Sequence, residues 1–154
     1  PGDIKIDEIF MNKLDFELEV AIVISKEGTN IHSSEADEYI AGLMIMNDFS
    51  ARDLQMKEMK LNLGPAKGKD FATSLGPCIV TLDELSDNIT QTDRGNHYCL
   101  NMECFINNEK ISEDNLKNIS CPFFVPFARY KSRILFINFL LETPDARVLG
   151  TAVR

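Results

Sequence analysis

The run from Asp15 to Ser25, DFELEVAIVIS, is the feature that most constrains how this chain can fold. A β-strand repeats every two residues, so Glu17 and Glu19 leave the same face, while the alternate apolar residues from Phe16 to Ile24 line the other face. Beyond the two glutamates, the acidic face is also apolar. Burying two neighbouring carboxylates without compensation is costly, so the pair indicates a bound cation, and a hard divalent metal ion is the best candidate.

The Glu17 and Glu19 pair has a second interpretation. At the start of an edge strand two glutamates can simply face water, and an isolated Glu-x-Glu pair is more often explained in that way than by a metal site. The pair alone leaves both interpretations open. Residues further along the chain decide between them.

Length and charge limit the classes of protein. With 154 residues, of which 44% are hydrophobic, the chain can bury a core, and we expect a single domain over residues 1–154. The formal net charge of -8 disfavours nucleic acid and anionic membrane surfaces as partners. No apolar run approaches the roughly 20 residues of a membrane-spanning helix, and the first residues lack the pattern of a signal peptide. The sequence therefore predicts a soluble, cytoplasmic protein.

The four cysteines lack the spacing of a zinc finger or zinc ribbon. Cys99 and Cys104 are five positions apart, so on one strand they would point to opposite faces and could not bind one ion together. We expect reduced, mostly buried thiols and no zinc site at His97.

Turn and capping signals predict a helix and then a strand after the first strand. Ser34 and Asp37 are placed as a capping box, and Gly42 is placed to end the helix. The apolar run over residues 43–46 predicts a strand that brings Asp48 to its end. A second helix is expected next.

This second helix is predicted to begin after Ser50, which can cap it, and to continue to Met59. Arg52 and Gln55 are three positions apart and therefore share a face near its first turn. A turn-rich loop over residues 63–70 follows.

The remaining elements are predicted to be mainly strands. We expect strands over residues 78–82 and 98–106, a hairpin turn at Asn107 and Asn108, and further strands over residues 134–141 and 147–151. Strands with interspersed short helices indicate an α+β domain built on a mixed β-sheet.

Three blocks resemble the fumarylacetoacetate hydrolase family, in the order and with the gaps typical of that family. They are DFELEVAIV, MNDFSARDLQ and LGPAKGKDFATSLGP, and the later NMECFINNEKISEDNL extends the likeness. The resemblance is to the C-terminal catalytic domain of the family. It implies a mixed β-sheet or β-roll domain with short helices, and a homodimer.

The resemblance also implies site residues. It implies that a Mg²⁺ or Mn²⁺ ion, with Ca²⁺ also possible, is held by three carboxylates: Glu17, Glu19 and Asp48. It implies that the substrate is contacted by three residues: Arg52, Gln55 and Thr151. Lys69 is implied as a catalytic residue, and Thr73 matches a threonine near a structural ion in some members.

Three carboxylates with open coordination positions suit a hard ion that keeps waters or substrate oxygens. A 2-oxo acid fits such an ion, since its ketone and carboxylate oxygens could chelate the metal, which would stabilise enolate charge as a carbon-carbon bond breaks. Lys69 and Arg52 would add positive charge. The implied activities are hydrolysis of acylpyruvates or fumarylacetoacetate, decarboxylation of oxaloacetate, and isomerisation or hydration of related 2-oxo acids.

Each of these residues also has an ordinary alternative. Asp48 could cap the helix beside it, Arg52 and Gln55 could form a solvated helix face, and Lys69 could be an exposed loop lysine. The order and spacing of the family blocks favour the functional interpretation.

Two departures from the family pattern affect the expected activity. Hydrolytic members use a histidine-glutamate pair ahead of the Glu-x-Glu strand, whereas only fourteen residues precede Asp15 here and none is histidine. A positioned base contributes roughly 10²–10⁴-fold, so we expect this chain to be a poor hydrolase. The chain also stops at Arg154, soon after Thr151, and we expect it to be incomplete at both ends. The alternative of another class is a catalytically silent, truncated module that keeps the metal-site residues.

Overall fold

The structure is a computed structural model that describes residues 5–10, 12–29, 31–62, 64–92, 95–118 and 134–136. In chain order, with η marking a 3-10 helix, its elements are η1 (Glu8–Phe10), β1 (Leu14–Ile24), η2 (Ser33–Tyr39), β2 (Ile40–Ala51), α1 (Arg52–Met59), β3 (Thr73–Leu75), η3 (Ser86–Asn88), β4 (Ile89–Thr92), β5 (Gly95–Tyr98), β6 (Asn101–Ile106), β7 (Glu109–Asn115), η4 (Leu116–Asn118) and β8 (Ile134–Phe136). Strands with short helices confirm the predicted α+β class.

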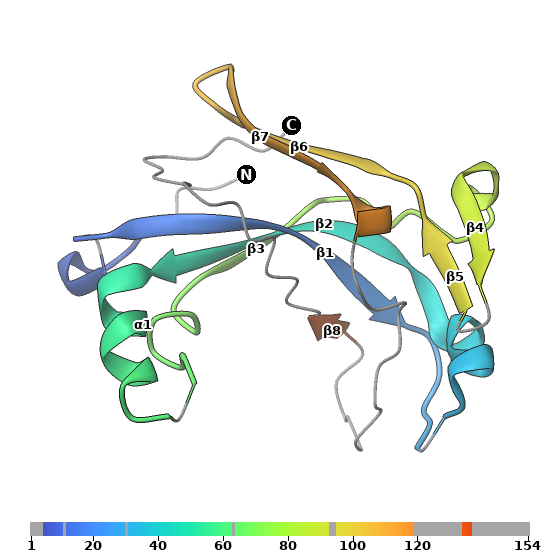
Figure 1. The fold of residues 1–154 in the computed structure, drawn as a ribbon, viewed down its shortest axis with the longest axis horizontal. Coiled ribbons are helices and arrows are strands. Elements are labelled where there is room, and N and C mark those ends of the chain that lie inside the picture. Colours follow the sequence, from blue (N-terminus) through green and yellow to red (C-terminus); the bar gives the residue numbers. More distant parts are fainter. Residues whose placement is uncertain are drawn as a thin grey trace.

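β1 and β2 form the long, bent centre of a four-stranded sheet with the strand order β3-β2-β1-β8 (Figure 1). Their antiparallel register pairs Glu17 with Asp48 and Glu19 with Met46. Directly paired residues share a face of the sheet, so the three carboxylates lie on one face. The strand predicted from Asp15 to Ser25 is confirmed to within one residue at each end.

The opposite face of β1 carries the apolar core. One cluster joins this face to the β4-β5 side of the molecule and contains Val20, Ile22, Ile40, Leu43, Leu85, Tyr98 and Leu116. A second cluster lies under the hairpin of β6 and β7 and contains Phe16, Leu18 and Cys104 (Figure 1). Because this face is covered by apolar packing, the acidic face of the sheet is left for the site.

β2 is longer than the sequence predicted, so Asp48 and Ser50 lie within the strand rather than at its end and at the start of the helix. Both residues lie inside β2, because the pairing with β1 continues to Ala51. The prediction that Ser50 caps α1 is wrong: its hydroxyl donates to the Asp48 carbonyl at 3.2 Å, and the N-cap residue Ala51 makes no side-chain capping bond. α1 itself is confirmed and is the only α-helix among the described residues.

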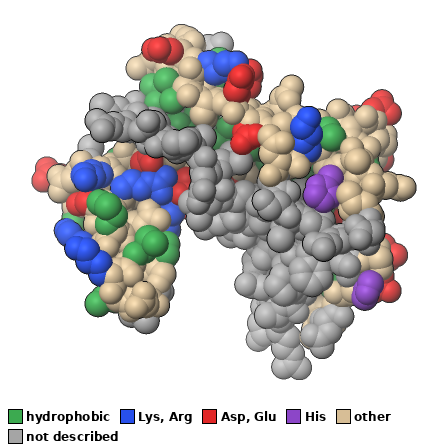
Figure 2. All heavy atoms as spheres, viewed as in Figure 1, with side chains coloured by type: hydrophobic (Ala, Val, Ile, Leu, Met, Phe, Trp, Pro, Cys, Tyr) green, Lys and Arg blue, Asp and Glu red, His purple; other side chains and the backbone are tan. Residues whose placement is uncertain are grey.

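The surface of α1 mixes charged and apolar side chains. Met56 and Met59 are 50% and 53% exposed, and Figure 2 shows basic and hydrophobic side chains side by side over this helix. No residue of α1 is buried. The helix therefore contributes to the fold mainly through the first turn that joins it to β2 and through the loop that follows it.

The first predicted helix is the 3-10 helix η2. Its N-cap is His32, not Ser34, and the Ser34 N–H donates to His32 Nδ1 at 3.4 Å. Gly42 does not end it, since this glycine lies in β2. A Cβ atom at Gly42 would lie 2.4 Å from the Val80 carbonyl oxygen, so glycine is needed there for the close approach of the Val80 backbone.

Several predictions for the later strands change. Residues 78–82 form a single bridge between Val80 and Leu43 where a strand was predicted, and the strand ahead of it is β3. Residues 98–106 are divided between β5 and β6. The hairpin turn is confirmed, with positive φ angles of 49° and 71° at Asn107 and Asn108.

Some predictions fall wholly or partly outside the described residues. Of the strand predicted over residues 134–141, residues 134–136 form β8. The strand over residues 147–151 and Cys121 lie outside the described residues. The described cysteines are free thiols, but only Cys104 is buried, since Cys78 is exposed and Cys99 is partly buried.

We predict that Gly42→Ala lowers the free energy of unfolding by about 1–3 kcal/mol, because the added methyl group overlaps the Val80 backbone. The matched control is Gly64→Asn: Gly64 has a φ of 71° and nothing within 4 Å of an added Cβ, and asparagine tolerates this backbone conformation. The control should change the free energy by about 0.5 kcal/mol or less. Urea unfolding measures both, and equal effects would contradict the close approach.

Candidate active site

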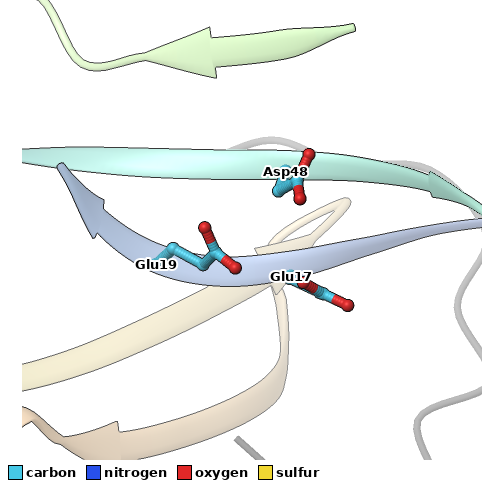
Figure 3. A group of neighbouring side chains, drawn as sticks. All are labelled: Glu17, Glu19 and Asp48. Carbon is cyan, nitrogen blue, oxygen red and sulfur yellow. The ribbon is translucent and has the colours of Figure 1, made fainter. Parts of the chain in front are cut away.

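Three carboxylates meet on the acidic face of the sheet: Glu17 and Glu19 from β1, and Asp48 from β2 (Figure 3). One oxygen from each lies within 4.8 Å of the others. Glu19 is 1% exposed and Asp48 is 5% exposed. The cluster follows from the register, which places Asp48 opposite Glu17 and two residues from the partner of Glu19.

Glu19 is a buried carboxylate with no hydrogen-bond donor in the part of the chain that the structure describes. Neither of its oxygens accepts a hydrogen bond from the described residues. Burial, followed by the neighbouring carboxyl groups of Glu17 and Asp48, raises the pKa of Glu19 to about 9. An ionised carboxylate at this position needs more positive charge than the described residues supply, and a divalent cation with oxygen ligands fits this need.

Lys69 supplies part of that charge. Its Nζ lies 2.6 Å from Glu17 Oε1 and 3.2 Å from Asp48 Oδ2, and its side chain is 12% exposed. Burial would raise the pKa of Glu17, but the bonds from Lys69 and Arg52 outweigh burial and lower it. At Asp48 burial prevails over Lys69, so the pKa of Asp48 is raised. Lys69 therefore compensates Glu17 more fully than the other two carboxylates.

Arg52 stands on the other side of Glu17, at the start of α1. Its Nη1 donates to Glu17 Oε1 at 2.7 Å, and its Nε donates to Asp15 Oδ2 at 2.6 Å. Nη1 also lies 3.0 Å from Gln55 Oε1. Burial opposes the charge of Arg52, but the bonds to Glu17 and Asp15 outweigh burial and raise its pKa. The guanidinium group thus ties the first turn of α1 to β1.

Asp15 is a site residue that the sequence analysis did not predict. It is 9% exposed, and its second oxygen, Oδ1, has no hydrogen-bond partner among the described residues. The available signal was its position two residues before Glu17, which puts it on the same face of the strand. It holds Arg52 in the orientation that reaches Glu17.

The structure brings together six of the site residues that the resemblance implies: Glu17, Glu19, Asp48, Arg52, Gln55 and Lys69. Thr151 lies outside the described residues. Thr73 pairs with Asp48 across β3 and β2, and its side chain is exposed. The roles of all these site residues in binding an ion or a substrate stay predictions.

Solved structures define the class of this fold. A fumarylpyruvate hydrolase from *Pseudomonas aeruginosa*, in complex with Mn²⁺ and pyruvate, matches with a TM-score of 0.60 at 18% identity over 81% of this chain and 53% of that one. A 5-carboxymethyl-2-hydroxymuconate delta-isomerase from *Mycobacterium smegmatis* matches with a TM-score of 0.53 at 27% identity over 68% of this chain and 36% of that one. The chain therefore shares the fold of these proteins.

Sequence comparison identifies the family. Residues 1–133 match the family described as Fumarylacetoacetate (FAA) hydrolase C-terminal. The fumarylacetoacetase of *Oryza sativa* subsp. *japonica* is 51% identical over 76 residues, which are 47% of this chain and 18% of that protein. The chain belongs to the fumarylacetoacetate hydrolase family. The matched part of the chain covers less than a fifth of the length of the rice protein.

Among the described residues, no helix combines the length and apolar character needed to cross a membrane. The cytoplasmic location and the homodimer stay predictions.

We predict that Glu19 makes the stability of the ion-free protein depend on pH. The carboxyl group titrates near its ordinary value of 4.5 when unfolded and at about 9 when folded. Between these values the folded state holds the extra proton, so the free energy of unfolding falls as pH rises, by up to about 1.4 kcal/mol per pH unit from this group.

Unfolding of chelator-treated protein from pH 5 to pH 8.5 tests this dependence. Glu19→Gln cannot lose the proton, so its stability should fall less steeply with pH than that of the wild type. The control variant Glu35→Gln changes an exposed residue of η2 and should follow the wild type. Parallel curves for Glu19→Gln and wild type would contradict the raised pKa.

Proposed function

We propose that this chain carries the site of a divalent-metal-dependent hydrolase or lyase that acts on carbon-carbon bonds of small 2-oxo acids. The observation that carries the proposal is Glu19, which is 1% exposed, lacks a donor among the described residues and lies beside two more carboxylates. Glu17, Glu19 and Asp48 would hold Mg²⁺ or Mn²⁺, with Ca²⁺ also possible. The Mn²⁺ and pyruvate in the structure of the *P. aeruginosa* hydrolase support this choice of ion and substrate class.

The bound ion would supply Lewis-acid stabilisation for the negative charge that develops on the ketone oxygen of the 2-oxo acid. Lys69 would stabilise the same charge, since its ammonium group already lies beside Glu17 and Asp48. Arg52, held by Asp15 and Glu17, would orient the substrate carboxylate. Gln55, in contact with Arg52, would fix the direction of that guanidinium group.

Decarboxylation of an oxaloacetate-like 2-oxo acid is the second candidate, and the positions of the histidines favour it. His32 caps η2, and His97 pairs with Thr90 between β5 and β4. η2, β4 and β5 all lie toward the end of the sheet away from α1 (Figure 1). Decarboxylation needs stabilisation of the developing carbanion but no base that activates water, so it makes less demand on a histidine.

Calorimetric titration of Mg²⁺ and Mn²⁺ into chelator-treated protein tests the ion site. We expect one ion to bind to the wild type and to the control Glu35→Gln. Glu19→Gln and Asp48→Asn should each weaken binding by more than about 100-fold, since even changes to outer partners of a metal site cost 10–100-fold. Absent binding in the wild type, or equal binding in all four proteins, would refute the site.

Assays with an acylpyruvate and with oxaloacetate then separate the activities. Release of pyruvate together with a second carboxylic acid identifies the hydrolase, and release of carbon dioxide from oxaloacetate identifies the decarboxylase. Tight ion binding with neither reaction would leave two alternatives, the silent module and an isomerase or hydratase of related 2-oxo acids.

A further inference from the structure

The loop over residues 64–70 is held against α1 by the carboxylate of Glu58. Three successive backbone N–H groups of the loop donate to this carboxylate, at 3.0, 2.7 and 3.0 Å, from Ala66, Lys67 and Gly68. Successive amides in this arrangement form a binding site for an anion. Here the anion is a side chain of the same protein.

The position of Glu58 in α1 does not explain why its carboxylate is stabilised in the charged form. Glu58 lies in the last turn of α1, where the helix dipole disfavours a negative side chain. The Gly68 amide, then the Lys67 and Ala66 amides, nonetheless lower the pKa of Glu58. The contacts of this carboxylate thus point to the loop rather than to α1.

Gly68 shows how closely the loop approaches the helix. Its carbonyl accepts a hydrogen bond from the Ala51 N–H at 2.8 Å, while its own N–H donates to Glu58. A Cβ atom on Gly68 would lie 2.8 Å from the Gln55 backbone nitrogen. The loop is therefore attached near both ends of α1 and packed against the helix between these attachments.

Lys69 follows Gly68 directly and takes its position from this attachment. Its N–H donates to the Ala66 carbonyl at 3.1 Å, within the same loop. Its ammonium group ends 2.6 Å from Glu17 and 3.2 Å from Asp48. A lysine side chain is long and flexible, so an ammonium group can be placed reproducibly only if the backbone that carries it is fixed.

We infer that Glu58 is a positioning residue, which fixes the loop over residues 64–70 on α1 and thereby fixes the ammonium group of Lys69 beside the carboxylates of β1 and β2. The inference rests on the role proposed above for Lys69. Glu58 acts on the site through Lys69 and not by contact with the substrate. Its effect can therefore be measured without any assay of activity.

Hydrogen exchange on the intact chain measures the attachment. In Glu58→Ala the amides of residues 66–68 should exchange at least about tenfold faster than in the wild type, because three bonds to a charged acceptor are lost. Glu58→Gln should be intermediate, since its amide oxygen still accepts. Glu35→Ala, at an exposed residue of η2, is the control and should match the wild type.

Acylation of lysines, followed by mass spectrometry, measures the position of Lys69. Its labelling rate should rise about tenfold in Glu58→Ala and less in Glu58→Gln, as the ammonium group leaves its ion pairs. The exposed Lys57 and Lys117 should label as in the wild type, which distinguishes a local change from general loosening of the fold. Unchanged exchange of the loop and unchanged labelling of Lys69 in both variants would overturn the inference.

Ion binding and turnover separate this inference from the proposed function. The Glu58 variants keep Glu17, Glu19 and Asp48, so they should still bind Mn²⁺, with a loss of affinity no larger than the roughly 10–100-fold of a changed outer partner and smaller than the loss in Glu19→Gln. Their kcat should fall while KM changes little, because Lys69 is expected to act on the developing charge. If the wild type binds no ion and turns over no substrate, the proposed function fails, whereas exchange and labelling still decide the role of Glu58.

Discussion

The antiparallel pairing of β1 with β2 is the interaction on which the rest of the structure depends. It places Glu17 opposite Asp48 and Glu19 opposite Met46, so side chains from distant parts of the chain share one small area of the sheet. The same alternation sends Phe16, Leu18 and Val20 to the other face, where they join the core. A shift of the register by one residue would exchange the two faces, burying the acids in the apolar packing. The core thus fixes the acidic cluster as firmly as it fixes the fold.

The positively charged side chains of the site compensate the three carboxylates to different extents. Arg52 and Lys69 both pair with Glu17, which becomes the best compensated of the three carboxylates. Among the described residues, Asp48 forms an ion pair with Lys69 alone, and Glu19 accepts no hydrogen bond. This uneven balance, at the point where the ligand oxygens converge, is the physical reason for proposing a divalent ion there. Two outer residues hold the positively charged side chains in place. Asp15 pairs directly with Arg52, and Glu58 binds the loop that carries Lys69.

Local patterns predicted the parts of this arrangement that depend on neighbouring residues. The period of two identified β1 and the common face of Glu17 and Glu19, and the spacing of Arg52 and Gln55 identified the face of α1. Capping signals failed where pairing between distant segments prevailed: Ser50 has the chemistry of an N-cap, but it lies inside β2 because β1 continues to pair with it. Gly42 has the chemistry of a helix end, yet it serves the approach of the Val80 backbone. The family resemblance singled out Asp48 and Lys69, and the structure places both beside the glutamates. No local pattern links residues so far apart in the sequence.

Anomalous diffraction from crystals of this chain grown with Mn²⁺ tests the carboxylate site most directly, because it locates the ion without relying on turnover. We predict a single strong anomalous peak bonded to one oxygen each of Glu17, Glu19 and Asp48, with the remaining positions filled by water. The contradictory result is a map without a peak on this face of the sheet, in which Lys69 still pairs with Glu17 and Asp48 and Glu19 keeps no ligand.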